Sequence, residues 1–307
     1  MASTTPVTVG ILAEPQLLGW HVRAIERLQR ETGVEVPLVV CNAGNANTGS
    51  KAEDSSARRA LEGVTGFVDD LRLEKAWMLV LAERTAARAL GDDQSLWHRH
   101  PVGEIDCLAS ADVLECEPHT DGVWNELPER AVTELADRCD VVVRFGFGLV
   151  RGDVLTAPEY GVLSFHPADI RRYRGMGPPA IFHDGRDRAG TTLQRLDESI
   201  DGGEVVAYEE VSLHDCYTVW DVFDRLATVQ IELLTEGVLS FRDPTFEPQT
   251  IPDEQLGDFY YRKLRRTPSF AGRVLAKNVS GRVRRRLELH LGDDGASRRE
   301  RASDFND

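Results

Sequence analysis

Three short stretches carry residues whose types and spacing suit acid–base chemistry. His166 ends the apolar run GVLSFH (161–166), and histidine is the side chain that most readily exchanges a proton near neutral pH. Asp201 stands directly before two glycines, so its carboxylate lies on a tight loop with exposed backbone amides. The third stretch, RFGFG (144–148), ends an apolar run in a Gly-x-Gly turn whose backbone a flat ligand can approach closely.

Each stretch alone also has a structural interpretation. A single histidine at a strand end is more often structural than catalytic, and Asp-Gly-Gly is a common hairpin turn. Gly146-Phe147-Gly148 lacks the third glycine of a phosphate-binding fingerprint. The order and spacing of all three together favour a functional site, because ligands of α/β folds bind at the carboxyl ends of the strands.

The elements that must position these residues alternate between strands and helices. The N-terminal third predicts a strand at 7–14, a helix at 20–33, a strand at 34–42, a loop at 41–57, a helix at 67–90 and a loop at 91–111. The remainder predicts strands at 112–117, 140–146 and 161–166, helices at 127–138 and 218–241, and a hairpin of 191–197 with 203–213. This alternation is typical of a doubly wound, mostly parallel, Rossmann-like α/β sheet.

The C-terminal section has a different character. From Arg262 to Leu287 there are ten basic residues and no acidic one. Apolar residues recur at helical spacing, at positions 270, 274, 279, 283, 287 and 291. One interpretation is a helix that docks its apolar side on the parent domain. The other is a basic amphipathic helix, over 262–291, that contacts anionic lipid or an acidic partner. Beyond Gly292 we expect a disordered tail.

Composition excludes several classes of protein. The formal net charge is -15, which argues against nucleic-acid binding because phosphate contacts need a basic surface. The five cysteines are scattered without a Cys-x-x-Cys pair, a pattern of reduced thiols rather than of disulfides or a zinc site. No secretory signal is visible, and no stretch reaches the roughly 20 apolar residues of a membrane span. We therefore expect a soluble cytoplasmic protein without a metal.

The stretch at 161–206 resembles the catalytic core of folate-dependent formyltransferases, the group that includes glycinamide ribonucleotide, methionyl-tRNA and sugar N-formyltransferases. The matching residues, in the family's order, are His166, Tyr173-Arg174-Gly175, Gly190-Thr191-Thr192 and Asp201-Gly202-Gly203. The preceding VVVRFGFGLVRGDVLTAPEYG also resembles the strand and loop that line the folate site. The resemblance covers 140–240, and before residue 140 only the β-α-β start agrees.

The resemblance implies transfer of a formyl group from 10-formyltetrahydrofolate to an amine, without a metal. It implies a catalytic role for His166, Asp201 and Ser164. It implies donor binding by Phe145, Gly146, Phe147, Gly148, Leu149, Glu198, Ser199, Ile200 and Gly202, and acceptor binding by Arg171, Arg172, Arg174 and Gly175. The chain then divides into a catalytic domain (1–241), a linker with a basic helical extension (242–292) and a tail (293–307).

One position departs from the family pattern. Two residues before the histidine the family has an asparagine, which with the histidine holds the formyl oxygen, while the aspartate assists proton transfer. Here this position is Ser164. Losing one oxyanion donor typically costs about a hundred- to thousandfold in rate. Ser164 therefore implies a water-bridged or re-aimed donor, a slower enzyme, or a protein that binds folate without transferring formyl.

Three functions follow from these observations. The first is formyl transfer to a small amine, with a sugar nucleotide as the preferred acceptor. Methionyl-tRNA is disfavoured, because residues 242–307 show a basic helical pattern where those enzymes carry a β-rich domain. The second is hydrolysis of the formyl donor by water. The third is non-catalytic binding of folate. The oligomeric state is not legible in the sequence.

Overall fold

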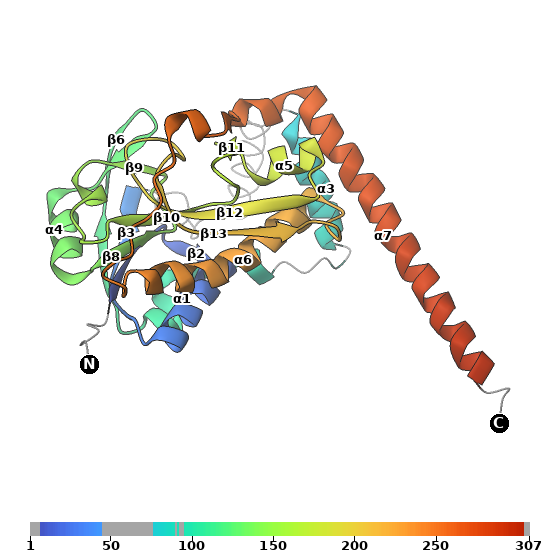
Figure 1. Cartoon of the computed structure of the whole chain (residues 1–307), viewed down its shortest axis with the longest axis horizontal. Coiled ribbons are helices and arrows are strands. Elements are labelled where there is room, and N and C mark those ends of the chain that lie inside the picture. The colour runs from blue at the N-terminus through green and yellow to red at the C-terminus, as the bar shows by residue number, and fades with distance from the viewer. Residues whose placement is uncertain (1–6, 45–75, 90, 92–94, 304–307) are drawn as a thin grey trace, which may run out of the picture.

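The computed structural model describes residues 7–44, 76–89, 91 and 95–303, with side chains as far as residue 288. At its centre lies a seven-stranded sheet in the order β13-β12-β10-β8-β1-β3-β5 (Figure 1). The strands are β1 (Thr8–Ala13), β3 (Glu35–Asn42), β5 (Asp112–Cys116), β8 (Val141–Arg144), β10 (Val162–His166), β12 (Arg188–Arg195) and β13 (Glu204–Ser212). The first five are parallel, and β12 and β13 pair antiparallel. The predicted fold class is confirmed.

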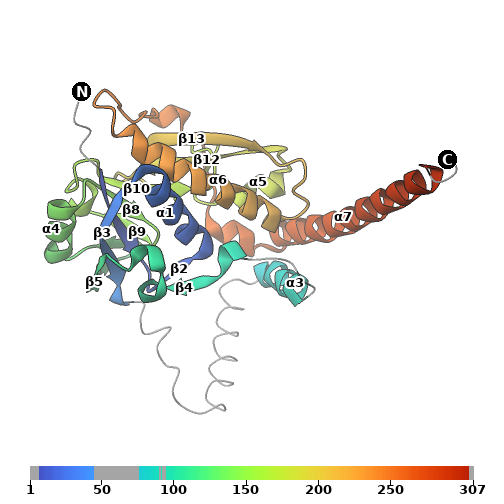
Figure 2. The same cartoon turned by 90° about the horizontal axis from the view of Figure 1, so that it is seen from below.

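Helices cover both faces of this sheet. On one face lie α1 (Gly19–Thr32) and α6 (Val219–Ser240), which stand in front of the strands in Figure 2. Their apolar sides bury Ile25 and Leu233 against the strands. On the other face α4 (Glu129–Arg138) buries Leu135 against Leu12 and Val142. Gly33 ends α1 in the left-handed conformation, at φ 68°, as its position after the helical pattern predicts.

Strand alternation in β8 and β10 decides what each face of the sheet presents. Val143 and Leu163 point toward α1 and α6, as do Phe145 and Phe165 one pleat further along. Val142 and Val162 point to the α4 side. Because side chains alternate along a strand, Arg144, Ser164 and His166 belong to the α4 side. The two strands therefore end with aromatic residues on one face and polar residues on the other.

Short elements surround the sheet. They are β2 (Gln16–Leu18), β4 (Arg99–Pro101), β6 (His119–Asp121), β7 (Trp124–Glu126), β9 (Leu149–Arg151), β11 (Tyr173–Arg174), α5 (Pro178–Asp184), β14 (Asp258–Phe259) and 3-10 helices at Ser95–Trp97, Val102–Glu104, Asp106–Leu108, Asp153–Leu155, Asp253–Gln255 and Arg262–Arg266. The expected loop at 91–111 thus contains β4 and three 3-10 helices. Val102, Ile105 and Leu108 are buried there, and their spacing of three matches a 3-10 turn.

Two predictions reach beyond the described residues. The expected helix at 67–90 corresponds to α3 (Trp77–Ala89), while 67–75 lies outside the described part. The expected loop at 41–57 is described only as far as Gly44.

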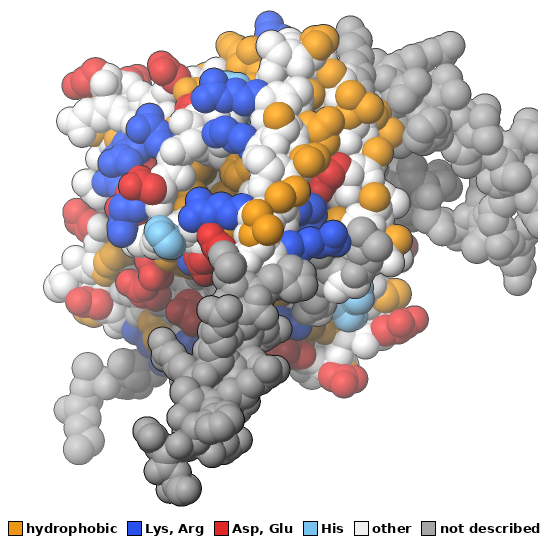
Figure 3. All heavy atoms as spheres, turned by 90° about the vertical axis from the view of Figure 1, so that its right-hand side faces the viewer, with side chains coloured by type: hydrophobic (Ala, Val, Ile, Leu, Met, Phe, Trp, Pro, Cys, Tyr) orange, Lys and Arg blue, Asp and Glu red, His pale blue; other side chains and the backbone are white. Residues whose placement is uncertain are grey.

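The C-terminal helix α7 (Pro268–Ser303) begins against the domain and then extends away from it (Figures 1 and 2). Phe270 and Val274 are buried beside α3 and α5, as the docking interpretation expects. Val279, Val283 and Leu287 are instead 51%, 54% and 57% exposed. Figure 3 faces this side of the molecule, where basic and apolar side chains lie next to one another. Contact of this exposed part with lipid or an acidic partner stays a prediction.

The helix continues to Ser303, through most of the segment for which we expect a disordered tail. The sequence GASRRERAS supplies good helix formers, so it continues the preceding helix. The division of the chain into domains at residues 241 and 292 remains a prediction.

Candidate active site

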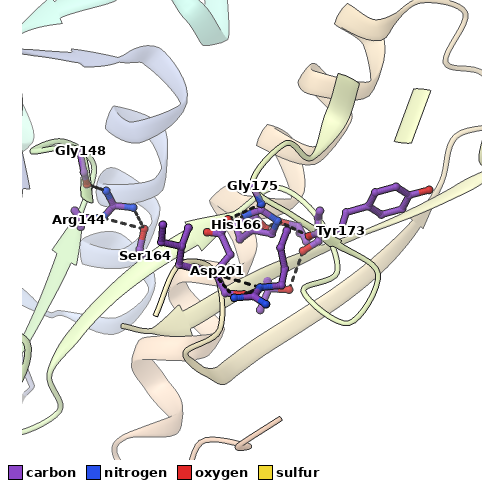
Figure 4. Close-up of polar contacts among 12 residues, drawn as sticks. Arg144, Gly148, Ser164, His166, Tyr173, Gly175 and Asp201 are labelled. Atoms are coloured by element: carbon purple, nitrogen blue, oxygen red, sulfur yellow. Dashed lines mark hydrogen bonds and ion pairs between the residues drawn. The ribbon is translucent and has the colours of Figure 1, made fainter. Parts of the chain in front are cut away.

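His166 and Asp201 meet, although 35 positions separate them in the chain. His166 ends β10, and Asp201 lies in the loop between β12 and β13. Nδ1 of His166 lies 3.3 Å from Oδ1 of Asp201 (Figure 4). The other carboxylate oxygen of Asp201 accepts a hydrogen bond from the Gly175 amide, at 2.8 Å. Three of the motifs that carry the sequence resemblance therefore converge at one point.

The loop around Asp201 is held in an unusual conformation. Asp201 has φ 50°, in the left-handed region that costs a non-glycine residue energy unless its surroundings fix it. The guanidinium of Arg174 fixes it by donating to the carbonyls of Ile200 and Asp201. Burial alone would raise the pKa of Asp201, but the hydrogen bond and charge of His166, the Gly175 amide and Arg144 lower it to about 2. Asp201 is thus a carboxylate at every working pH.

His166 is enclosed, although it stands at the end of its strand. Its side chain is 5% exposed. Nε2 lies 2.8 Å from the Tyr173 carbonyl oxygen, which can only accept, so Nε2 carries a proton. Nδ1 faces the carboxylate of Asp201, so both ring nitrogens point at hydrogen-bond acceptors.

Ser164 lies beside an arginine on the neighbouring strand. Arg144 and Ser164 are register partners on β8 and β10. Nη2 and Nε of Arg144 donate to Oγ of Ser164, at 2.7 Å and 3.2 Å, and Nη1 donates to the carbonyl of Gly148 (Figure 4). Burial lowers the pKa of Arg144 below its ordinary value, and the charge of Asp201 partly offsets this. On the other side, Gln194 of β12 pairs in register with Ser164 and has a buried, unpaired Oε1.

A cavity of about 460 Å³ opens at the carboxyl ends of the strands. Arg144, Ser164 and Glu14 supply polar groups to its lining. The rest of its wall is mainly aromatic, with Trp20, His21, Trp97, Phe145, Phe165 and Phe223 among its residues. The ring of His21 stacks on Phe145 at 4.4 Å, and burial lowers the pKa of His21 to about 3. His21 is therefore a neutral aromatic surface at this wall.

The predicted donor residues do not share one cavity. Phe145, Gly146 and Gly148 line the cavity of about 460 Å³, whereas Glu198 lines a second one of about 570 Å³. Leu149, Ser199, Ile200 and Gly202 are in neither lining. Phe147 is fully buried in the core on the α4 side. Its φ of 65° directs the side chain there, a reversal that strand alternation does not predict.

The arginines predicted to bind the acceptor all have partners within the chain. Arg171 donates to Asp169 at 2.7 Å and lies over the ring of Tyr208. Arg172 reaches Asp169 and Glu210 at 3.7 Å each, and Arg174 holds the Asp201 loop. Of the predicted acceptor residues, Gly175 touches the Asp201 carboxylate through its amide, and Arg174 touches the Asp201 backbone carbonyl.

Sequence reasoning missed several residues that support the site. Arg144 ends a strand of valines, and a charge at the end of such a buried run is the signal that could identify it. Glu14 accepts the Phe147 amide at 2.8 Å, and Asn125 donates to the Phe147 carbonyl at 2.6 Å. These two hydrogen bonds hold the Gly-x-Gly turn. Both residues lie far from the motifs, so only the folded chain reveals them.

Two further features of the described residues bear on other functions. Within 7–44, 76–89, 91 and 95–303, no group of three or more His, Cys, Asp and Glu side chains is arranged to hold a metal ion. Over the same ranges, no helix combines the length and apolar character needed to cross a bilayer.

Comparison with known families finds one match. Residues 124–238 match the family model described as formyl transferase. A methionyl-tRNA formyltransferase from Lachnospira eligens is 32% identical over 164 residues, which is 50% of this chain and 51% of that protein. One from Bacillus cereus is 28% identical over 163 residues, 51% of this chain and 52% of that protein. The chain therefore spans about half the length of these relatives.

Two solved structures are also similar to this chain. Glycinamide ribonucleotide transformylase 1 from Symbiobacterium toebii has a TM-score of 0.47 at 19% identity, covering 80% of this chain and 95% of that one. An N-formyltransferase from Helicobacter canadensis, in complex with folinic acid and dTDP-3-aminofucose, has a TM-score of 0.49 at 10% identity, covering 84% and 71%.

Proposed function

We propose, from the match of residues 124–238 to the formyl transferase family model, that the protein transfers a formyl group from 10-formyltetrahydrofolate to an amine of a small acceptor. The observation that carries the proposal is the convergence of His166 with Asp201 beside Gly175. These residues come from three separate segments. The Arg144–Ser164 pair links β8 and β10 two residues before His166 and adds hydrogen-bond donors at this end of the strands.

The proposed reaction exchanges one carbon–nitrogen bond for another. The amine nitrogen of the acceptor attacks the formyl carbon and forms the new bond, while the bond from that carbon to N10 of the folate breaks. The proton that the amine loses is balanced by the proton that N10 gains. Negative charge develops on the formyl oxygen during the attack, so donors directed at that oxygen lower the barrier.

We assign the proton transfer to His166 and its orientation to Asp201. Because Asp201 remains a carboxylate, with a pKa of about 2, it stabilises the imidazolium of His166 without giving up a proton itself. Nε2 must exchange its contact with the Tyr173 carbonyl for a contact with substrate. This exchange brings the Nε2 proton to the substrate.

The carboxyl ends of the strands offer the groups that a folate donor needs. A pterin needs exposed backbone groups beside an apolar wall, and the turn at Phe145–Leu149 offers backbone at Gly146 and Gly148 next to the ring of Phe145. We propose that the donor binds against this turn and against the loop from Glu198 to Gly202. Its contribution to the reaction is the formyl group.

For the acceptor we propose an amino-sugar nucleotide. The aromatic wall of the cavity gives a flat base or a sugar ring a surface to stack on. The three arginines at 171, 172 and 174 already have partners in the chain. We therefore place the acceptor on the aromatic wall of the cavity and not on the segment that carries these arginines. Methionyl-tRNA and glycinamide ribonucleotide are the competing acceptors.

The test is formyl transfer by the purified chain from 10-formyltetrahydrofolate to a panel of amines. The panel holds amino-sugar nucleotides, glycinamide ribonucleotide and methionyl-tRNA, and a sample without any amine. Mass spectrometry follows the added formyl group, and a formate assay follows hydrolysis. We expect formylation of an amino-sugar nucleotide and little formate. Transfer should be lost in His166→Asn, which replaces the imidazole by a polar side chain that cannot exchange a proton in its place.

Other outcomes contradict this proposal in different ways. Formate release at the same rate without amine identifies a hydrolase. Donor binding without turnover on every amine identifies a non-catalytic folate-binding protein. Preference for glycinamide ribonucleotide or methionyl-tRNA keeps formyl transfer and overturns the sugar nucleotide.

A further inference from the structure

We propose that Arg144 turns the Ser164 hydroxyl into the donor that the family's asparagine supplies elsewhere, so that the Arg144–Ser164 pair stabilises the charge on the formyl oxygen. This inference rests on the proposed formyl transfer. In this inference the Ser164 hydroxyl donates a hydrogen bond to the formyl oxygen. Arg144 positions that hydroxyl and makes it a stronger donor.

The hydrogen bonds that Ser164 accepts leave only its hydroxyl proton for a further contact. A serine hydroxyl has one proton and two lone pairs. Both N–H contacts from Arg144 end on Oγ of Ser164, at 2.7 Å and 3.2 Å, and so occupy the lone pairs. No hydrogen bond from the Ser164 hydroxyl to another described residue accompanies them. The hydroxyl proton is therefore available to a substrate oxygen in the cavity that Ser164 lines.

The charge of Arg144 strengthens this donor. Arg144 makes no ion pair with a described carboxylate at 4.0 Å or less, although the negative charge of Asp201 acts on it and raises its pKa against the effect of burial. A guanidinium held on the cavity wall without a contacting carboxylate favours negative charge on a ligand. It also withdraws electrons from the hydroxyl it contacts, so the Ser164 proton becomes a better donor as the substrate oxygen gains charge.

The strand register explains why a serine stands here. Arg144 and Ser164 are register partners on parallel strands, and neighbouring strands lie about 4.8 Å apart, so the two side chains can touch. A guanidinium reaching across leaves room for a short side chain at position 164. Asparagine at 164 would occupy the space of the Nη2 contact and push the guanidinium away. We therefore infer that the arginine and the serine form one unit and replace the asparagine together.

The kinetic test compares single and double variants in the full chain. Arg144→Met and Ser164→Ala should each lower kcat by about a hundredfold, the scale of one oxyanion donor, with little change in KM for the donor. The double variant R144M/S164A should be no slower than the slower single variant, because the pair acts as a unit. Arg138→Met, at an arginine that instead binds Asp112 and the Pro37 carbonyl, is the control and should keep full activity.

A compensating pair sharpens the test. Ser164→Asn alone should lower kcat, because the carboxamide displaces the guanidinium, whereas R144A/S164N should recover at least about tenfold over Arg144→Ala, since the asparagine can then supply the donor itself. A gain in kcat from Ser164→Asn with Arg144 in place would overturn the proposal. So would additive losses in R144M/S164A.

A measurement without turnover separates this inference from the proposed function. Infrared spectroscopy of bound 10-formylfolate, labelled with ¹³C at the formyl carbon, reports how strongly its carbonyl is polarised. The stretch should lie at lower frequency in the wild type than in Arg144→Met, Arg144→Lys or Ser164→Ala, with Arg138→Met like the wild type. The same frequency in all of them overturns the inference, whether or not the wild type transfers formyl. A frequency shift in a protein that does not transfer formyl supports this inference and contradicts only the proposed reaction.

Discussion

The two faces of β8 and β10 present opposite chemistries at the same end of the same strands. On the α4 side lie Arg144, Ser164 and His166, held by hydrogen bonds and charge. On the α1 side lie Phe145 and Phe165. Both pack against Trp20, with ring centroids 5.8 Å and 5.7 Å from the centroid of its ring. The pleat alone separates them, because adjacent residues point to opposite faces.

This contrast indicates how the protein divides its work. Hydrogen-bonded groups fix positions to within a few tenths of an ångström, which a proton transfer needs. Aromatic packing supplies burial and a surface for flat ligands. We therefore expect changes on the polar face to cost rate at nearly constant stability, and changes on the aromatic face to cost stability and affinity first.

The largest expected effect is on the polar face. His166→Ala should lower turnover by at least about a hundredfold, as for removal of a general acid–base residue, while circular dichroism stays that of the wild type. Steady-state rates with one donor and one acceptor measure it. Near-normal turnover would place His166 among structural residues and remove it from the mechanism.

The next effect belongs to the aromatic face. Trp20→Ala should lower the free energy of unfolding by about 3–5 kcal/mol, the usual cost of removing a buried tryptophan, and raise KM for the acceptor more than it lowers kcat. Denaturant titration gives the first quantity and initial rates the second. Trp20→Phe is the matched control, because Nε1 of Trp20 has no hydrogen-bond partner to lose. If both variants lose rate but no stability, the contrast between the faces fails.

The sequence predicts some features of the two faces and misses others. Periodicity predicts the order of strands and helices, because each element's apolar pattern is local. The motifs predict His166 and Asp201, whose meeting requires only that β10 and the Asp201 loop reach one edge. Arg144 requires knowledge that β8 lies next to β10 in register, which no local pattern contains. Phe147 requires a positive φ, and no alternation rule anticipates that reversal.

The arginine arm shows a further limit of sequence reasoning. Three arginines within four positions suggest an anion site, yet Asp169, Glu210 and the carbonyl of Ile200 take them up. Whether a charged side chain is available depends on partners brought by other segments. The composition of a short stretch cannot supply that information.

A pH experiment tests the aromatic face again. His21 is neutral in the fold because burial lowers its pKa from 6.5 to about 3, so between these values the unfolded chain binds a proton that the folded chain excludes. The free energy of unfolding should therefore fall as pH falls through this window, by up to about 1.4 kcal/mol per pH unit. Denaturant titrations from pH 7 to 4 should show a shallower slope for His21→Phe, and parallel slopes would refute this assignment.

The smallest effect separates the polar face from the aromatic one by its pH window. The pKa of Asp201 is lowered from 3.8 to about 2, so its carboxylate stabilises the fold above about pH 4. That stability disappears as pH falls from about 4 to 2, because the folded state resists the proton that the unfolded state accepts. Asp201→Asn should cost about 2 kcal/mol of unfolding free energy at pH 7, with the difference from wild type shrinking below pH 4. Unlike His21→Phe, it should leave the slope between pH 6.5 and 4 unchanged. A changed slope between pH 6.5 and 4 would contradict the assignment of the window from about pH 4 to 2 to Asp201.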